Sequence, residues 1–392
     1  ANMSGDRQQQ YFSDAVTEEV AAELTRIDRA FVIDRDTAFS LRGRPFDPRQ
    51  VGKQFSVRYV LEGSVWRIGD YLRITLLLID NETQLDVWSE FYQVPRDLLP
   101  RLPNTVATRL AQSLRLGIAP APADRPDPGA TAVDLFRRGR AETIAEGVQT
   151  RESYRAARDL LERAVRESPD FAAAQTWLAR VLAAMLANGW SDAPDADAVR
   201  AQSLLDALQR AGVDSVDRRV AQGILRRLQG RLDDAIKELE LAVALGRNDL
   251  SGNFELAATL VLAGRPQDAI PRLQAALRLN PAGTFAALQH RELGRAQALL
   301  GRADEAIAAL KRARALDDDS WSAAVDLAAA FGMRGDIDDG KAALAAARRI
   351  NPALTSIAVA RASESGSGGP RYIELRQATL DAGLRKLGVE ER

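Results

Sequence analysis

Apolar and small residues repeat along the second half of the chain in units of two short helices. The clearest unit runs from Asp249 to Pro281, where apolar positions at helical spacing lie on both sides of a turn at Gly264. A small residue marks the same point of the second helix in four units, at positions that are 34, 37 and 34 residues apart: Ala235, Ala269, Ala306 and Gly340. The regular spacing predicts a stack of equivalent helix pairs that share one apolar core.

The residues around each marker repeat as well. Each marker has a glycine five positions before it, a leucine four positions after it and an alanine seven positions after it, as Gly264, Leu273 and Ala276 are placed around Ala269. This order resembles the tetratricopeptide repeat, a helix-turn-helix unit of about 34 residues. Residues 134–169 and 171–211 carry weaker copies, so we expect about six repeats. The resemblance implies an all-α solenoid.

The first 117 residues follow a different pattern. Apolar residues at helical spacing predict helices over residues 11–31, 47–55 and a last one that contains Val106, Leu110 and Leu114. Runs rich in β-branched and aromatic residues predict strands over residues 30–34, 58–68, 71–79 and 85–94. Gly69 and Asp70 form a two-residue hairpin signal. This order of elements predicts an α/β domain over residues 1–117.

Three stretches of this domain resemble one known family. They are NMSGD (2–6), YFSDAVTEEV (11–20) and VRYVLEGSVWRIGDYLRITLLLID (57–80), and they are similar to the TolB amino-terminal-like domain. The resemblance implies a mixed sheet with flanking helices. It also implies an open sheet edge, because the family has an apolar strand before the first stretch and this sequence starts after it. Such domains, followed by tetratricopeptide repeats, are known from bacterial class III adenylate/guanylate cyclases and from winged-helix transcriptional regulators, so an effector domain is expected upstream.

Changes in composition divide the rest of the chain. Residues 118–131 are rich in proline, and we expect them to link the α/β domain to a solenoid over residues 132–362. Serine and glycine dominate residues 363–370, which predicts a break before a final helix over residues 371–387. Residues 363–392 are thus expected to form a C-terminal segment whose helix caps the apolar end of the stack.

Composition excludes several classes of chemistry. The chain has 46% hydrophobic residues, a formal net charge of −1, no cysteine and one histidine, His290. Without cysteine there is no disulfide, thiol nucleophile or thiolate zinc site. The balanced charge gives no general attraction to nucleic acid, and no apolar run approaches the ~18 residues of a membrane span. We therefore expect no nucleic-acid partner and no membrane span, and we assign no catalytic, cofactor-binding or metal-binding residue.

Two acidic motifs resemble binding sites but lack a required residue. GDIDDGKA (335–342) matches a phosphate-binding loop, except that Ala342 stands where Ser or Thr would hold magnesium and that its aspartates would repel phosphate. Asp192, Asp195 and Asp197 lack the glycine and the terminal glutamate of a calcium loop. We interpret the first motif as a helix junction within a repeat and the second as a solvated loop.

The repeats instead offer a groove. In solenoids of this family, the second, fifth, ninth and twelfth positions of each first helix face the concave side. Here these positions include Arg227, Phe254, Arg291 and Arg295 among residues that are mostly small or apolar. Arg291 and Arg295 are one helical turn apart, so both guanidinium groups could contact one acidic segment. The four residues are the candidate peptide-binding groove, and exposed arginines without a binding role are the alternative.

These patterns predict a regulatory interaction module with no catalytic site of its own, in which a protein or peptide segment binds the groove. The resemblance implies the regulatory region of a bacterial adenylate cyclase in the cytoplasm, with a periplasmic location and a winged-helix regulator as alternatives. Another alternative is a small-ligand sensor, in which the α/β domain binds a signal molecule and the repeats relay it. The oligomeric state is left open, with a homodimer among the alternatives.

Overall fold

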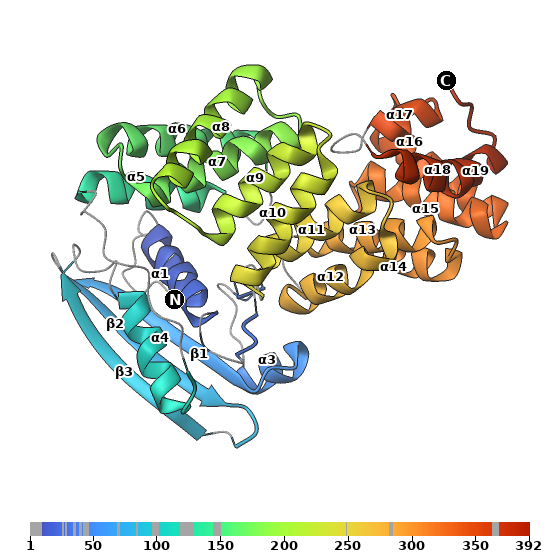
Figure 1. Cartoon of the computed structure of the whole chain (residues 1–392). Helices are drawn as coiled ribbons and strands as arrows, with labels where there is room; N and C mark the ends of the chain where they lie inside the picture. The colour runs from blue at the N-terminus through green and yellow to red at the C-terminus, as the bar shows by residue number, and fades with distance from the viewer. Residues whose placement is uncertain are drawn as a thin grey trace. The chain divides into compact units, whose positions relative to one another are not determined.

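The structure is a computed structural model of the chain (Figure 1). It describes residues 10–25, 27, 30–33, 37–38, 41, 47–68, 71–83, 85–95, 102–117, 129–143, 150–247, 249–281, 285–362 and 368–392. The contacts divide the chain into two compact units, one of Ala1–Ala174 with Pro281–Gly283 and the other of Gln175–Asn280 with Thr284–Arg392. Each unit is described by itself.

A three-stranded antiparallel sheet forms the centre of the first unit. Its strands are β1 (Tyr59–Ile68), β2 (Tyr71–Asp80) and β3 (Leu85–Pro95), in that order across the sheet. Ile68 pairs with Tyr71, as expected for strands joined by two residues. Buried and more exposed residues alternate along β2, because successive side chains of a strand point to opposite faces.

Two helices and the sheet bury a common core. The helices are α1 (Gln10–Leu24) and α4 (Leu102–Ser113), which pack on each other. Their apolar stripes and the buried face of the sheet form one cluster: Val16, Val20, Ile27, Val65, Leu72, Ile74, Leu76, Leu78, Leu102, Val106, Leu110 and Ala111. A further helix, α3 (Pro48–Phe55), precedes β1. The predicted helix over residues 47–55 and the three strands of the hairpins are therefore confirmed.

Other predictions for this unit differ from the structure. No strand forms over residues 30–33, and α1 ends at Leu24 although the apolar pattern continues to Phe31. Within the described residues the sheet is antiparallel and not mixed, since hairpins join its strands. The stretch NMSGD and residues 118–128 of the expected linker lie outside the described residues, so the predicted domain boundaries stay a prediction.

A helix pair completes the first unit. It consists of α5 (Ala130–Glu142) and α6 (Arg151–Glu167), which pack closely on each other. α5 also contacts α1, and the buried Arg137 of α5 donates from Nε to Glu19 Oε1 of α1 at 3.2 Å. Thr150 caps α6 by accepting a hydrogen bond from the backbone N–H of Ser153 at 3.1 Å.

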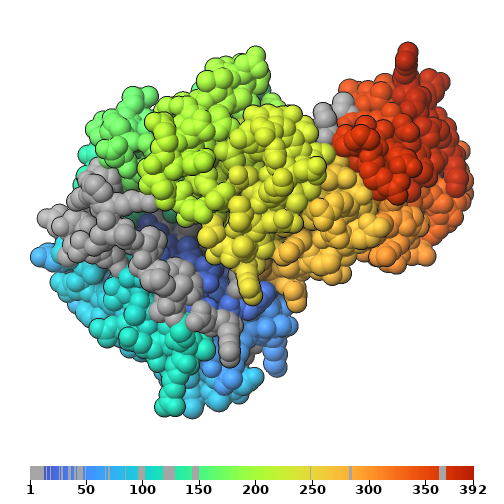
Figure 2. Space-filling view, in the orientation of Figure 1, coloured from blue at the N-terminus to red at the C-terminus, as the bar shows by residue number. Residues whose placement is uncertain are grey.

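The second unit continues with helix pairs along the chain. The helices are α7 (Ala172–Ala187), α8 (Pro194–Arg210), α9 (Val216–Leu228), α10 (Leu232–Leu245), α11 (Leu250–Leu262), α12 (Pro266–Leu279), α13 (Ala286–Leu299), α14 (Ala303–Leu316), α15 (Trp321–Arg334) and α16 (Ile337–Ile350). From α9 on, the two helices of each pair pack on each other and each second helix packs on the next first helix. In the space-filling view these pairs follow one another from yellow to orange (Figure 2).

The predicted register of the repeats is confirmed. The markers Ala235, Ala269 and Ala306 have no exposed surface, and Gly340 is buried as well. The glycines five positions before the markers all have positive φ, between 74° and 99°, where residues with a Cβ are strained: Gly230, Gly264, Gly301 and Gly335. The small residues therefore lie where helices meet, and the glycines form the turns between the helices of a pair.

We expect Ala306→Phe to destabilise the array by about 1–3 kcal/mol, because a large side chain must enter a closely packed seam. Ala306 has no exposed surface, whereas Ala308 of the same helix is exposed. The matched control is therefore Ala308→Phe, which should change the free energy of unfolding by no more than about 0.5 kcal/mol. Urea unfolding followed by circular dichroism measures both, and equal effects would contradict the assigned seam.

Candidate functional site

The first helices of the repeats line one face of the stack. Along the series α9, α11, α13 and α15, each helix contacts the next one directly, while the second helices α10, α12, α14 and α16 approach one another less. A stack in which one row of helices lies closer together curves toward that row. We call this side of the second unit the inner face. It carries all four residues of the candidate groove.

Arg227, at the end of α9, is buried and bridges to the next first helix. Its guanidinium donates from Nη1 to Glu255 Oε2 of α11 at 2.7 Å and to Thr259 Oγ1 at 3.4 Å. The side chain is only 4% exposed. Arg227 therefore joins two neighbouring repeats through a charge-assisted hydrogen bond.

Arg291 and Arg295 of α13 contact a carboxylate within the chain. Arg291 Nε and Arg295 Nη2 both donate to Asp326 Oδ2 of α15, at 3.0 and 3.1 Å. Arg295 Nη1 also donates to Glu292 Oε1 at 3.3 Å. All four side chains are buried. The acidic partner expected for the two arginines is thus a residue of the following repeat, and a contact with a separate peptide stays a prediction.

The environment of Asp326 explains its charge. Burial alone would raise the pKa of this carboxyl group, but the charges of Arg295, Arg291 and Arg376 outweigh burial and hold the pKa below its ordinary value. Asp326 is therefore an ionised group inside the array, and arginines surround it. Such a group is stable only while its partners remain in place.

Phe254 of α11 is the most accessible of the four predicted residues. It is half-buried, as are Ser251 and Ala258 on the same face of α11, and Leu288 of α13 is 37% exposed. Arg180 of α7 reaches this part of the inner face, where it pairs with Asp217 of α9 and donates to Ser251 Oγ at 2.5 Å. This part of the inner face therefore combines partly exposed apolar side chains with paired polar ones.

The C-terminal segment folds back on the first helices α11 and α15, which no sequence pattern predicted. The expected single helix over residues 371–387 is two helices, α18 (Pro370–Ala378) and α19 (Leu380–Lys386), because Thr379 is not helical, with φ −121° and ψ −87°. α19 packs extensively against α15. Gly332 and Gly383 lie so close that a Cβ on either would meet the other helix's backbone. Figure 1 draws α19 beside α15.

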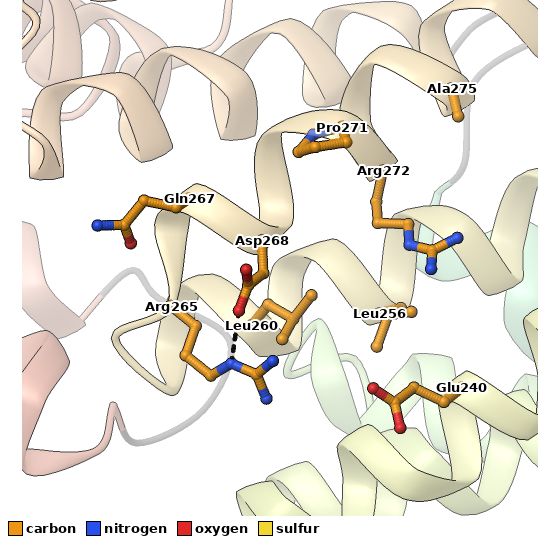
Figure 3. Close-up of a pocket in the computed structure, with 9 residues that line it drawn as sticks. All are labelled: Glu240, Leu256, Leu260, Arg265, Gln267, Asp268, Pro271, Arg272 and Ala275. Atoms are coloured by element: carbon orange, nitrogen blue, oxygen red, sulfur yellow. Dashed lines mark hydrogen bonds and ion pairs between the residues drawn. The ribbon is translucent and has the colours of Figure 1, made fainter.

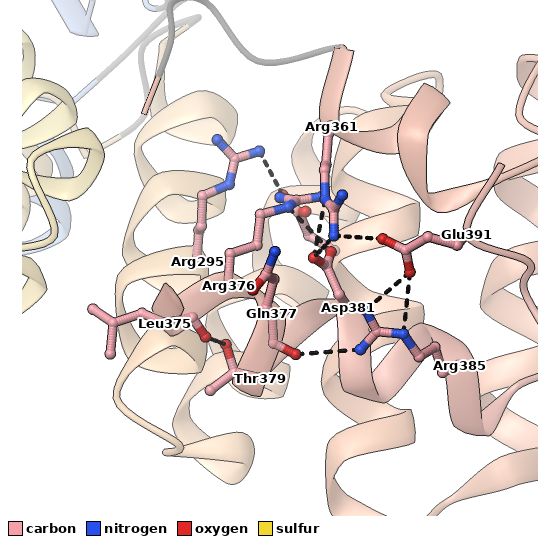
Figure 4. A network of polar contacts seen from close by, with 10 residues as sticks. Arg295, Arg361, Leu375, Arg376, Gln377, Thr379, Asp381, Arg385 and Glu391 are labelled. Carbon is pink, nitrogen blue, oxygen red and sulfur yellow. Dashed lines mark hydrogen bonds and ion pairs between the residues drawn. The ribbon is translucent and has the colours of Figure 1, made fainter. Parts of the chain in front are cut away.

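Buried charges hold the C-terminal segment together (Figure 4). Asp381 of α19 has no exposed surface, and Arg376 Nε of α18 lies 3.2 Å from its Oδ1. Arg361, from helix α17 (Ile357–Ala362), pairs with the other carboxylate oxygen of Asp381. Arg361 also pairs with Glu391 at 2.9 Å. The signal that could have revealed this arrangement is the alternation of arginines and acids over residues 361–391.

A separate pocket lies between α10, α11 and α12 (Figure 3). Its volume is about 390 Å³, and Glu240, Leu260 and Pro271 are among the residues that line it. The charged side chains at its rim are exposed, and Arg265 Nε donates to Asp268 Oδ2 at 2.8 Å. Because the pocket lacks a buried polar side chain that would orient a ligand, we assign it no function.

The acidic motifs have structural roles. GDIDDGKA forms the junction of α15 and α16, where Gly335 ends the first helix at φ 99°. Asp197 was expected in a solvated loop, but it is buried in the first turn of α8. There it accepts a hydrogen bond from Ser191 Oγ at 2.7 Å. Among the described residues, no group of three or more His, Asp or Glu side chains could hold a metal ion. His290 is half-buried on α13, and burial and the charge of Arg312 lower its pKa.

Comparison with known families agrees with the helix pairs. Two family models, both described as tetratricopeptide repeat, match residues 148–184 and 260–331. The helical array is built of tetratricopeptide repeats. The fold is therefore a small three-stranded sheet followed by a tetratricopeptide-repeat solenoid. None of the described helices is both long enough and apolar enough to cross a membrane.

One relative and several solved structures resemble the chain. It is 32% identical over 199 residues to putative adenylate cyclase 3 of Rhizobium meliloti (strain 1021), a match over 50% of this chain and 33% of that protein. The chain thus spans about a third of that relative's length. Cut9–Hcn1 of the APC/C is 18% identical over 59% of this chain and 45% of its own, with a TM-score of 0.46. YrrB, described as a TPR protein with an unusual peptide-binding site, is 19% identical, with a TM-score of 0.38. That match covers 52% of this chain and 96% of the YrrB chain. These structural likenesses concern the fold of the repeats alone.

Proposed function

We propose that this chain is a non-catalytic interaction module that binds a segment of another protein on the inner face of its repeats. The observation that carries the proposal is the surface of α11 and α13, where Phe254 is half-buried and Leu288 is partly exposed beside paired polar groups. Accessible apolar residues with polar groups around them are what protein interfaces use as contact points. Arg227, Arg291 and Arg295 have a supporting part in this proposal, because they join the repeats that present the surface.

The finer proposal concerns the protein in which the module works. The relative from Rhizobium meliloti is named a putative adenylate cyclase, and the chain matches about a third of it. The amino-terminal stretches resemble the TolB amino-terminal-like domain, which accompanies such repeats in bacterial cyclases. We therefore assign the module to the regulation of a bacterial adenylate cyclase through protein contact in the cytoplasm, with no cofactor of its own.

A photo-crosslinking experiment tests the proposal. A benzophenone amino acid replaces Phe254 in the full chain, and a second variant carries it in place of Val199, an apolar residue of α8 that is 71% exposed. After irradiation in bacterial cells, we expect position 254 to crosslink a cyclase catalytic domain, in the same protein or in a separate one, and position 199 to give no crosslink. Crosslinks of equal yield at both positions, or none at position 254, would overturn the assigned surface. A crosslink to a protein without a cyclase domain would retain the interaction module and reject the cyclase.

A further inference from the structure

We propose that α18 is a built-in ligand of the inner face, and that the partner is a helical segment that presents an aromatic residue and, four residues later, an arginine. This inference rests on the proposed interaction function and names the class of partner. We call residues 368–379 the strap. The strap contains α18. Its first residues contact the end of α11, and Arg376 near its other end acts on the charge of Asp326 of α15.

The strap begins at the turn that ends α11. The N–H of Gly369 donates to Leu262 O at 2.8 Å, and Gly369 lies beside Leu232 of α10. A Cβ on Gly264 would lie 2.6 Å from Cβ of Arg371, so the turn accepts the strap only because residue 264 has no side chain. Glycine is the usual residue where another segment has to approach the backbone closely.

Two buried side chains anchor the strap. Tyr372 is 2% exposed and Arg376 is 4% exposed, whereas Ile373 is 47% exposed and Gln377 is exposed on the outer side of the same helix. Tyr372 and Arg376 are four residues apart, so they lie on one face of α18. Apart from these two anchors, α18 buries no side chain. A helix that is held by two side chains is easier to release than one held by a continuous apolar stripe.

The second anchor enters a site that is built for a guanidinium group. Arg376 Nε lies 3.2 Å from Oδ1 of the buried Asp381 of α19, and the charge of Arg376 also helps to lower the pKa of the buried Asp326 of α15. Both carboxylates have other arginine partners, Arg361 for Asp381 and Arg295 for Asp326, so they keep a counter-charge when Arg376 leaves. An arginine from another protein can therefore take the same place without leaving a carboxylate alone.

The C-terminal helix α19 can stay bound while the strap leaves. Leu380, Leu384 and Leu387 are each at most 6% exposed, so α19 has an apolar stripe of its own. The break at Thr379 separates α19 from α18. The strap is thus the replaceable part of the C-terminal segment, and α19 is the fixed cap of the solenoid.

A competition experiment in the full chain tests the inference. The anchor variant is Tyr372→Ala with Arg376→Ala, and the matched control is Ile373→Ala with Gln377→Ala on the outer side of the same helix. The probe is a fluorescein-labelled peptide of residues 368–379, GGPRYIELRQAT, followed by fluorescence anisotropy. We expect the probe to bind the anchor variant at least tenfold more tightly than the control variant and the unaltered chain. A probe with alanine in place of Tyr372 or of Arg376 should bind the anchor variant at least tenfold more weakly.

Equal binding of the probe to all three proteins, or no binding to a folded anchor variant, would overturn the inference. Hydrogen exchange of the unaltered chain gives a second measurement that does not depend on the variants. The amides of α18 should exchange at least tenfold faster than those of α15, and equal rates would also overturn it. Neither result bears on the crosslink at position 254, so the failure of this inference and that of the proposed function are distinguishable.

Discussion

Asp326→Ala is expected to lower the free energy of unfolding of the repeat array by about 3 kcal/mol, because it removes the carboxylate that two buried arginines share. Glu292 then remains as the acidic side chain that contacts both arginines. Arg291 and Arg295 both donate to this side chain from α13, and both are buried. Arginine side chains in proteins keep their positive charge. The positive charges would then have to draw water into the seam between the last two repeats.

A surface carboxylate provides the control for Asp326. Asp304 pairs with Arg334 at 2.8 Å, but its side chain is 80% exposed. Asp304→Ala should therefore change the free energy of unfolding by less than about 1 kcal/mol. Urea denaturation with circular dichroism compares the two. If both variants lose the same small amount, the charge cluster around Asp326 does not stabilise the array.

The effect of Asp326 also has an expected pH dependence. The pKa of Asp326 is lower in the folded chain than in the unfolded chain, so its ionised form stabilises the fold at pH values above about 4. This stabilisation is lost as the pH falls through the folded pKa. The difference between the unaltered chain and Asp326→Ala should therefore be constant near pH 7 and shrink only in acid. A difference that shrinks between pH 8 and pH 6 would contradict this assignment.

Leu310→Ala is expected to cost about 2–5 kcal/mol, because it removes a side chain that fills the space beside a glycine. Leu310 of α14 has no exposed surface, and a Cβ on Gly294 of α13 would lie 2.5 Å from its Cγ. The glycine and the leucine therefore fit each other, and the backbone of α13 cannot move into the cavity without separating from its other neighbours. The same fit recurs between Gly223 and Leu239.

Thermal and urea unfolding measure this effect against Leu316→Ala on the same helix. Leu316 is 42% exposed, so its truncation should cost no more than about 0.5 kcal/mol. Gly294→Ala offers a complementary test, since the added methyl group has to displace Leu310. Similar stabilities of Leu310→Ala and Leu316→Ala would show that the two helices of this repeat are not packed as described.

The repeat register could be predicted from the sequence because each small residue serves a local contact that recurs at a fixed spacing. The repeat spacing predicts that Ala235, Ala269 and Ala306 lie at helix contacts, and all three are fully buried. The strands of the sheet were predictable for the same reason, since alternation along β2 reflects burial of one face. The strand expected at residues 30–34 failed because a short apolar run does not distinguish a strand from a loop that covers a core.

The partners of the charged residues were not predictable in the same way. Arg291 finds its carboxylate 35 residues later, at Asp326, and Arg227 finds Glu255 28 residues later. Each carboxylate lies on the first helix of the next repeat. Pairing the arginines of one first helix with the acids of the next first helix would therefore have suggested both contacts. Helical spacing relates only neighbours on the same helix, so the predicted partner of the guanidinium groups of Arg291 and Arg295 was an external segment. The packing of α18 against the repeats could not be predicted from a periodic pattern of apolar residues, because only two side chains of this helix are buried.

The contact between Arg137 and Glu19 has a practical consequence for anyone who wishes to produce the repeats alone. A fragment cut in the proline-rich stretch would begin with α5 but lack α1, so it would expose the guanidinium group and the apolar surface that α1 covers. Such a fragment is expected to precipitate or to lose its first helix pair during purification. A cut just before α7, which leaves α5 and α6 with the sheet, respects the contacts within each half and should give the better-behaved product.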